Sequence, residues 1–183
     1  MSDAPASAIS AADHELLLSY IRDVPDWPEP GVMFKDITPL LRQPDVFAKT
    51  VDLLAAAADG PIDAVVGIEA RGFILGAPVA NRLGAGFVPV RKEGKLPSDT
   101  SSASYELEYG QATIEVHRDA FTDGERVLIV DDVLATGGTV RATVDLVRAA
   151  GAEVAAVSIL MELGFLHGRK KLLDVDVHVL LSL

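Results

Sequence analysis

The stretch RVLIVDDVLATGGT, at residues 126–139, decides the fold. Its apolar first part predicts a buried strand over residues 126–130, and the run T-G-G-T opens a predicted helix over residues 138–150. A strand that enters a helix through a glycine turn is typical of open α/β sheets, which bind ligands beyond the carboxyl ends of their strands. The stretch therefore predicts both a sheet and the position of a site.

The turn before this helix predicts a site for a phosphate monoester. A helix N-terminus offers unpaired N–H groups and a partial positive charge, and glycines let the backbone approach an anion closely. Threonine hydroxyls add further donors. The turn consists of Ala135, Thr136, Gly137, Gly138 and Thr139.

Two acids, Asp131 and Asp132, follow the predicted strand and can accept hydrogen bonds from vicinal ribose hydroxyls. Taken alone, the acids could be metal ligands or solvated residues, and the glycine turn could be an ordinary helix cap. A dinucleotide site would need G-x-G-x-x-G and a P-loop would need G-K-[ST], and the stretch has neither. The combination of strand, paired acids and glycine–threonine turn favours a sugar-phosphate site.

The rest of the chain alternates between predicted strands and helices, which indicates an α/β fold with a mostly parallel central sheet flanked by helices. Further strands are predicted at residues 62–68, 87–91, 153–160 and 176–181, and further helices at residues 11–24, 44–59 and 71–83. Residues 1–183 are expected to form a single domain, with a flexible tail over about residues 1–10.

One segment interrupts the alternation. The polar stretch KEGKLPSDTSS precedes ASYELEY and ATIEVH, which predict a hairpin. A long polar loop inside a compact domain is uncommon unless it covers a binding site. We therefore expect a lid loop over residues 92–112.

The composition excludes several classes of protein. With 16 basic and 27 acidic side chains the net charge is −11, which argues against a nucleic-acid partner. No apolar run is long enough to cross a membrane, and no export signal is recognised at the N-terminus. The chain contains no cysteine. We expect a cytoplasmic protein that meets an anionic substrate with a local set of donors.

Residues 126–139 resemble the phosphoribosyl pyrophosphate motif of the type I phosphoribosyltransferases. Four other segments are similar to the adenine-specific members of that family: PGVMFKDITPLL at 30–41, GIEARGFILGAPVA at 67–80, VRKEGKLP at 90–97 and YELEYG at 105–110. The resemblance runs from about residue 27 to residue 161. It implies the type I fold with a hood, and transfer of a phosphoribosyl group from phosphoribosyl pyrophosphate to adenine, giving AMP and pyrophosphate. It also implies Mg²⁺, carried mainly by the substrate pyrophosphate rather than by direct protein ligands, and a homodimer.

The resemblance assigns a pyrophosphate-binding role to four basic residues. Arg71 stands at a predicted helix start, where a cation is unfavourable unless an anion binds beside it. Arg91, Lys92 and Lys95 cluster at the end of a predicted strand. Without the resemblance, Arg71 could be a surface arginine and the other three a solvated basic face.

The same resemblance assigns roles to the lid and to the base-binding side. Glu108 is the expected general acid/base near the purine N7, with Tyr109 beside it in the nucleotide site, although the alternation around them could be only one face of a hairpin. The expected adenine-binding residues are Val32, Met33, Phe34 and Lys35. Met33 and Phe34 could instead belong to the core, and Lys35 stands where many adenine-specific members have arginine, so it lacks that side chain's planar fork.

Two other functions are compatible with the same fold. One is a transferase for an oxopurine such as hypoxanthine or xanthine. The other is a regulator that binds a nucleotide without turnover, but such proteins tend to carry a basic face or an extra domain, which this chain lacks.

Overall fold

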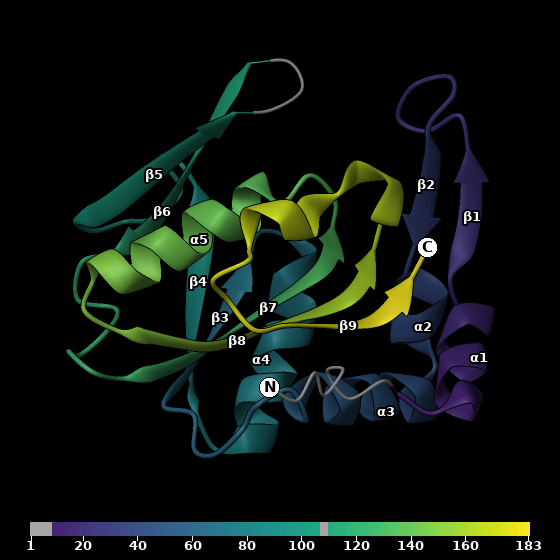
Figure 1. Cartoon of the computed structure of the whole chain (residues 1–183), viewed down its shortest axis with the longest axis horizontal. Coiled ribbons are helices and arrows are strands. Elements are labelled where there is room, and N and C mark those ends of the chain that lie inside the picture. The colour runs from purple at the N-terminus through teal and green to yellow at the C-terminus, as the bar shows by residue number, and fades with distance from the viewer. Residues whose placement is uncertain (1–8, 107–109) are drawn as a thin grey trace.

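A computed structural model describes residues 9–106 and 110–183. Their main sheet has the order β5–β6–β4–β3–β7–β8–β9, with helices on both faces (Figure 1). Strands β3, β4, β7, β8 and β9 run parallel, whereas β6 is antiparallel to both β4 and β5. The bounds are β3 Ala64–Ile68, β4 Gly86–Lys92, β5 Thr100–Glu106, β6 Gln111–His117, β7 Arg126–Leu134, β8 Glu153–Glu162 and β9 Val177–Ser182. The predicted α/β fold with a mostly parallel sheet is confirmed.

Strand β7 lies between two hydrophobic cores, one on each face of the sheet. Leu128 and Val130 face the core beneath α3 (Pro44–Ala55) and α4 (Arg71–Leu83), which also holds part of α1 (Ala11–Ser19). Val127 and Ile129 face the core beneath α5 (Gly138–Ala149). All four side chains are fully buried. Burial on both faces explains why this strand reads as a continuous apolar run instead of an alternating one.

The prediction of a helix over residues 11–24 is wrong in its second half. Helix α1 ends at Ser19, and Arg22–Pro25 forms β1, which pairs antiparallel with β2 (Met33–Asp36). A proline disfavours helical geometry in the residue before it, and the Arg22 guanidinium lies 2.6 Å from Asp36 Oδ2 across the ribbon. Strand pairing therefore replaces the last turns of the predicted helix.

The polar stretch after β4 is also shorter as a loop than predicted. Its last three residues, Thr100 to Ser102, already belong to β5, so the connection from β4 covers only residues 93–99. Small hydroxyl side chains suit this strand because they pair across it, as Ser104 Oγ and Thr113 Oγ1 do at 2.9 Å. The predicted hairpin itself is present as β5 and β6.

Several short elements were not predicted from the sequence. They are α2 (Thr38–Arg42) and two 3₁₀ turns between β8 and β9, η1 (Gly164–Leu166) and η2 (Gly168–Lys171). In Figure 1 the β1–β2 ribbon and the β5–β6 hairpin rise at opposite ends of the sheet, with the carboxyl ends of the central strands between them. Within the described residues, no helix has the length and apolar character needed to span a membrane.

Candidate active site

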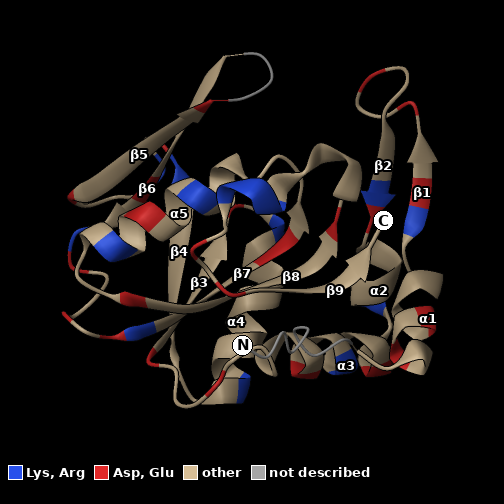
Figure 2. Cartoon of the chain, in the orientation of Figure 1, with Lys and Arg blue, Asp and Glu red and all other residues tan. Residues whose placement is uncertain are grey.

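A cavity of about 260 Å³ lies at the carboxyl ends of the central strands. It collects residues from the turn after β3, the end of β4, the β5–β6 hairpin, β7 and the start of α5. They are Ile68, Glu69, Ala70, Arg71, Lys92, Tyr105, Ile114, Asp131, Asp132 and Thr139. Five predicted site residues, at positions 71, 92, 131, 132 and 139, therefore share one cavity. Figure 2 shows blue and red segments side by side at these strand ends.

The turn predicted to bind phosphate forms a smaller adjoining pocket of about 70 Å³. Ala135, Thr136, Gly137 and Thr139 line it together with residues of β7, and α5 begins at Gly138. Among the described residues no side chain caps this helix, so its first N–H groups remain available to a ligand. The predicted turn is thus placed beside the acid cavity.

A backbone contact fixes the shape of this turn. Gly137 has a φ of +77°, and a Cβ at this position would collide with the carbonyl oxygen of Gly168 in η2. A Cβ on Gly138 would lie 2.9 Å from the Tyr105 ring. Because these two residues have no side chain, η2 packs against Gly137 and the β5–β6 hairpin packs against Gly138. The sequence pattern alone did not indicate either contact.

The two acids lie inside β7, not beyond its end as predicted, and they are buried, with 9% and 5% of Asp131 and Asp132 exposed. Asp131 Oδ1 accepts a hydrogen bond from the Asp132 amide at 2.9 Å. Asp132 Oδ2 lies 2.7 Å from Arg71 Nε, an ion-pair distance, yet it has no aligned hydrogen bond from any described residue. The buried oxygen keeps its capacity to accept one from a ligand.

Burial raises the pKa of both carboxyl groups. For Asp131 the neighbouring charge of Asp132 raises the pKa further, to well above its ordinary value. For Asp132 burial also raises the pKa, and the Arg71 guanidinium offsets part of this rise. Folding therefore holds two carboxylates together at an energetic cost.

Arg71 reaches the acids because α4 approaches β7 closely. The approach depends on Gly72, where a Cβ would lie 2.8 Å from Asp131 Oδ1 and 3.0 Å from the Val130 carbonyl oxygen. The Arg71 guanidinium also lies over the Phe34 ring, 5.0 Å from its centroid, a cation–π distance. Phe34 in turn meets Trp27 edge-on at 4.3 Å. One arginine thus joins the acid pair to the aromatic end of the β1–β2 ribbon.

Arg91 and Lys95 gather at the same strand ends through a residue that the sequence analysis did not single out. Lys95 Nζ forms an ion pair with Glu69, and Arg91 Nε lies 3.4 Å from Glu69 Oε2. Glu69 stands beside Arg71 in the quoted sequence, so its closeness to the site could have been inferred, but its partners lie more than twenty residues away.

The four predicted base-binding residues, of which Val32 precedes β2 and the other three belong to it, do not share one surface. Val32, Met33 and Lys35 line an apolar pocket of about 530 Å³, whereas Phe34 faces Arg71. Successive residues of a strand point to opposite faces, so Phe34 lies on the face of β2 opposite Met33 and Lys35. Val32 and Met33 are 43% and 49% exposed and are not core residues. Lys35 Nζ is bound to Asp23 at 2.6 Å.

The opposite wall of this apolar pocket comes from the connection after β8. Leu163, Phe165 and Leu166 line it, with Leu183. No sequence signal pointed to them. The other two residues predicted for the site, Glu108 and Tyr109, lie outside the described residues.

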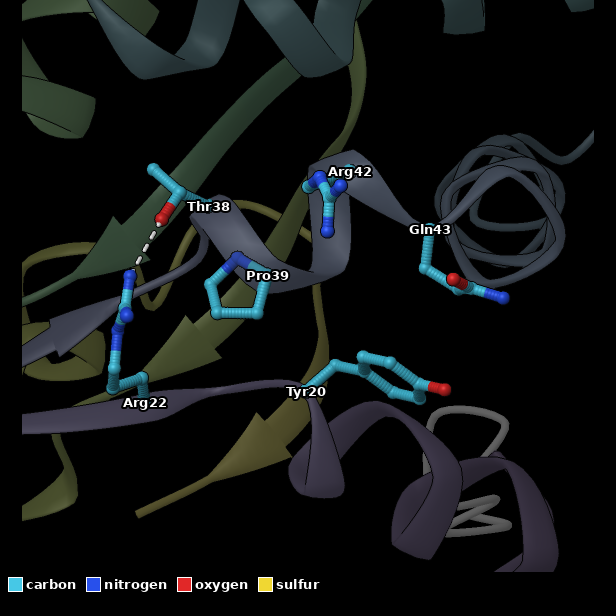
Figure 3. A pocket seen from close by; sticks show the side chains of 6 residues that line it. All are labelled: Tyr20, Arg22, Thr38, Pro39, Arg42 and Gln43. Atoms are coloured by element: carbon cyan, nitrogen blue, oxygen red, sulfur yellow. Dashed lines mark hydrogen bonds between the residues drawn. The ribbon is translucent and has the colours of Figure 1, made fainter.

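A fourth pocket, of about 370 Å³, lies between α1, β1 and α2 (Figure 3) and contains none of the predicted site residues. In this view Arg22 points toward Thr38, with 3.2 Å between the guanidinium nitrogen and the hydroxyl oxygen. The Arg22 guanidinium is also paired with Asp36, so this cation is already compensated within the ribbon. The pocket is separate from the strand-end cavity.

Comparison with known proteins identifies the family. A family profile described as the phosphoribosyl transferase domain matches residues 40–180. The chain belongs to the phosphoribosyltransferase family.

Its similarities lie with the adenine phosphoribosyltransferases of this family. The enzyme of that name from Thermobifida fusca (strain YX) is 61% identical over 166 residues, which cover 90% of this chain and 94% of that protein. The crystal structure of adenine phosphoribosyltransferase from Rhodothermus marinus DSM 4252 superposes with a TM-score of 0.91 at 53% identity, covering 95% of this chain and 100% of that one. The structure of the Saccharomyces cerevisiae enzyme, complexed with an imino-altritol bisphosphate and adenine, gives a TM-score of 0.87 at 40% identity, covering 93% and 99%. The fold is that of the type I phosphoribosyltransferases.

The backbone contact in the phosphate turn can be tested with two glycines of positive φ. We expect Gly137→Ala to lower the free energy of unfolding by more than Gly84→Ala, and to weaken AMP binding. Gly84, with a φ of +69°, has no described atom within 4 Å of a Cβ, so that variant carries only the left-handed backbone cost of about 1–2 kcal/mol. Urea unfolding of both variants measures the difference, and equal losses would contradict the contact.

The acid pair predicts a pH-dependent stability. Folding raises the pKa of Asp131, so the folded protein loses stability as the pH rises from the unfolded value, about 3.9, toward the folded pKa. We expect Asp131→Asn to raise the melting temperature at pH 7.5, by about 2–4 °C for each kcal/mol relieved. The gain should vanish near pH 4.

Exposed Asp119 provides the control for this substitution, since the structure places no partner beside its side chain within the described residues. Asp119→Asn should leave the melting temperature unchanged at both pH values. A less stable Asp131→Asn protein at pH 7.5 would show that the buried carboxylate stabilises the fold instead of straining it.

Proposed function

We propose that this chain transfers the 5-phosphoribosyl group of phosphoribosyl pyrophosphate to adenine, releasing AMP and pyrophosphate in purine salvage. The observation that carries the proposal is the buried Asp131–Asp132 pair beside the open N-terminus of α5. High identity to proteins named adenine phosphoribosyltransferase supports the choice of base.

In the proposed complex the 5′-phosphate binds the N–H groups and hydroxyls of residues 135–139. The ribose hydroxyls donate to the acids above it, where Asp132 Oδ2 has an unused acceptor position. The same carboxylates then lie near the sugar as positive charge grows on it in an oxocarbenium-like transition state. Their burial strengthens this electrostatic interaction because the protein interior screens charges less than bulk water does.

The pyrophosphate leaving group is proposed to face Arg71, Arg91, Lys92 and Lys95. Arg71 lies within the acid cavity, and guanidinium groups bind phosphate oxygens by paired hydrogen bonds. These cations stabilise the negative charge that gathers on the leaving group. Arg71 would then contact both the pyrophosphate and Asp132, which places it between the leaving group and the sugar.

Mg²⁺ fits this arrangement as a companion of the pyrophosphate. No group of three or more acidic or histidine side chains placed to hold a metal occurs in the described ranges, but the two buried acids and the unsatisfied Oδ2 offer oxygen donors beside the substrate. When bound, the ion would neutralise charge on the leaving group. By the family resemblance the substrate pyrophosphate would hold the ion, and Asp131 and Asp132 would lie beside it without serving as its main ligands.

The base is proposed to enter at the β1–β2 ribbon, which carries the expected adenine-binding residues Val32, Met33, Phe34 and Lys35 on its two sides. Apolar walls suit a purine, and Phe34 lies next to Arg71 at the edge of the acid cavity. The adenine N9 then attacks C1′ as pyrophosphate leaves. By the resemblance described above, Glu108 lies near the purine N7 and acts as the general acid/base for the proton that adenine loses. Tyr109 belongs to the lid, which excludes water when it closes.

We also propose that residues 1–183 act as one domain, that the chain works as a homodimer and that it acts in the cytoplasm. The family resemblance supports the dimer, and the absence of cysteine suits a reducing compartment.

The decisive test measures pyrophosphate release with adenine, hypoxanthine, guanine, xanthine and orotate, with and without Mg²⁺. We expect turnover with adenine and dependence on Mg²⁺. Turnover with an oxopurine alone would contradict the choice of base, and nucleotide binding without turnover of any base would favour a regulator.

The catalytic role of the lid is tested with Glu108→Ala, for which we expect kcat to fall on the order of 10²–10⁴-fold, as on loss of a general acid/base. AMP binding should be mostly preserved. Glu106→Ala, which removes an exposed carboxylate two positions earlier on β5, is the control and should retain activity. Full activity of Glu108→Ala would refute the assignment.

A further inference from the structure

Glu69 lies at the centre of the basic residues that are proposed to bind pyrophosphate. Its carboxylate, 9% exposed, accepts a hydrogen bond from Lys95 Nζ and a second from the Lys92 amide at 3.0 Å. Arg91 Nε lies 3.4 Å from its Oε2. The Arg91 guanidinium also donates to the Lys95 carbonyl oxygen at 3.0 Å. The Glu69 carboxylate thus contacts both the end of β4 and the loop that follows it.

The backbone holds this carboxylate at the edge of the acid cavity. The Glu69 amide donates to the Val90 carbonyl oxygen at 3.0 Å, which joins the turn after β3 to β4. Glu69, Arg71 and Lys92 all line the cavity. An anion that enters beside Arg71 and Lys92 therefore meets a carboxylate fixed at the same place.

This carboxylate is charged at neutral pH. Burial alone would raise the pKa of Glu69, but the hydrogen bonds from Lys95 and the Lys92 amide outweigh burial, so the pKa lies below its ordinary value. Two like charges that share a set of cations repel each other and divide the cations between them. Glu69 is therefore placed to compete with a pyrophosphate group.

We propose that Glu69 is a positioning residue that pairs with Lys95 and Arg91 before substrate binds and competes with pyrophosphate for these two cations when it binds. Without ligand, Glu69 keeps the two cations ordered near the cavity. After the reaction, it takes them back and so weakens the hold on the pyrophosphate product. This inference rests on the proposed function, because it assumes that pyrophosphate binds beside Arg71.

A second buried glutamate offers a matched control. Glu115 on β6 is 8% exposed and holds the same loop, accepting hydrogen bonds from the Gly94 amide at 3.0 Å and the Thr100 hydroxyl at 3.2 Å. No cation contacts its carboxylate within the described residues. Glu69 and Glu115 therefore share the anchoring of the loop, but only Glu69 pairs with the proposed pyrophosphate-binding cations.

The experiment measures pyrophosphate binding in the presence of Mg²⁺ by titration calorimetry for the whole chain. We expect Glu69→Gln to bind on the order of tenfold more tightly than the wild type, because one screened charge repulsion and one competitor are lost. Glu69→Asp, which keeps the charge, and Glu115→Gln should stay within about twofold of the wild type. In turnover, the KM for phosphoribosyl pyrophosphate should fall for Glu69→Gln while the KM for adenine stays unchanged.

The direction of this change separates competition from simple anchoring, because damage to a site weakens binding and does not tighten it. Unchanged or weaker binding by Glu69→Gln would overturn the inference. Glu69→Ala is a second neutral variant with the same expected tightening, and failure of both neutral variants to fold would show Glu69 to be an anchor of the fold. A wild type that binds no pyrophosphate would instead refute the proposed function, whatever the variants do.

Discussion

Two carboxylates buried side by side in β7 are the constraint on which the rest of the site depends. Adjacent buried charges are unfavourable unless cations, dipoles or ligands compensate them. In the described structure Arg71 supplies a positive charge at 2.7 Å from Asp132, and the N-terminus of α5 lies nearby with its partial positive charge. The compensation is incomplete, because one carboxylate oxygen keeps no hydrogen bond. The folded protein thus keeps a buried acceptor without a hydrogen-bond donor, and the two hydroxyls of a ribose could supply one.

The scaffold can carry this cost because the strands around the acids are buried on both faces. Strand β7 pairs with β3 on one side and β8 on the other, and its apolar residues belong to two separate cores. A sheet packed in this way is hard to deform, so the acids cannot relax toward solvent. Close backbone approaches at Gly72 and Gly137 then bring α4 and η2 against the same strand end. The rigid sheet and the two glycines together determine the shape of the site.

The sequence predicted the part of this arrangement that depends on local patterns. The alternation of strands and helices predicted the sheet, and the strand–acid–glycine motif predicted that the two acids and the glycine turn lie at its strand ends. The family resemblance added Arg71 and Lys92, which line the same cavity as the acids. What it could not predict depends on pairing between distant segments. Residues 22–25 read as helix because their partner strand, β2, lies eight residues further along, and Pro25 was the only local warning.

Side-chain partners were the other limit. Nothing near Lys35 in the sequence indicates that its ammonium group is bound to Asp23 across the ribbon, and nothing near Glu69 indicates that Lys95 reaches it. The family resemblance assigned Phe34 and Met33 to the same base-binding segment, whereas strand geometry places their side chains on opposite faces of β2. Sequence patterns identify which residues lie at a strand end. The charged partners of those residues come from distant segments of the chain and cannot be identified from local patterns.

The guanidinium of Arg71 lies between the Phe34 ring and the Asp132 carboxylate. It therefore contacts an aromatic face and an anion that belong to different parts of the chain, the β1–β2 ribbon and the central sheet. A displacement of the β1–β2 ribbon would change the aromatic contact of the same cation that compensates Asp132. The charge balance of the buried acids therefore depends on the position of this ribbon as well as on the central sheet.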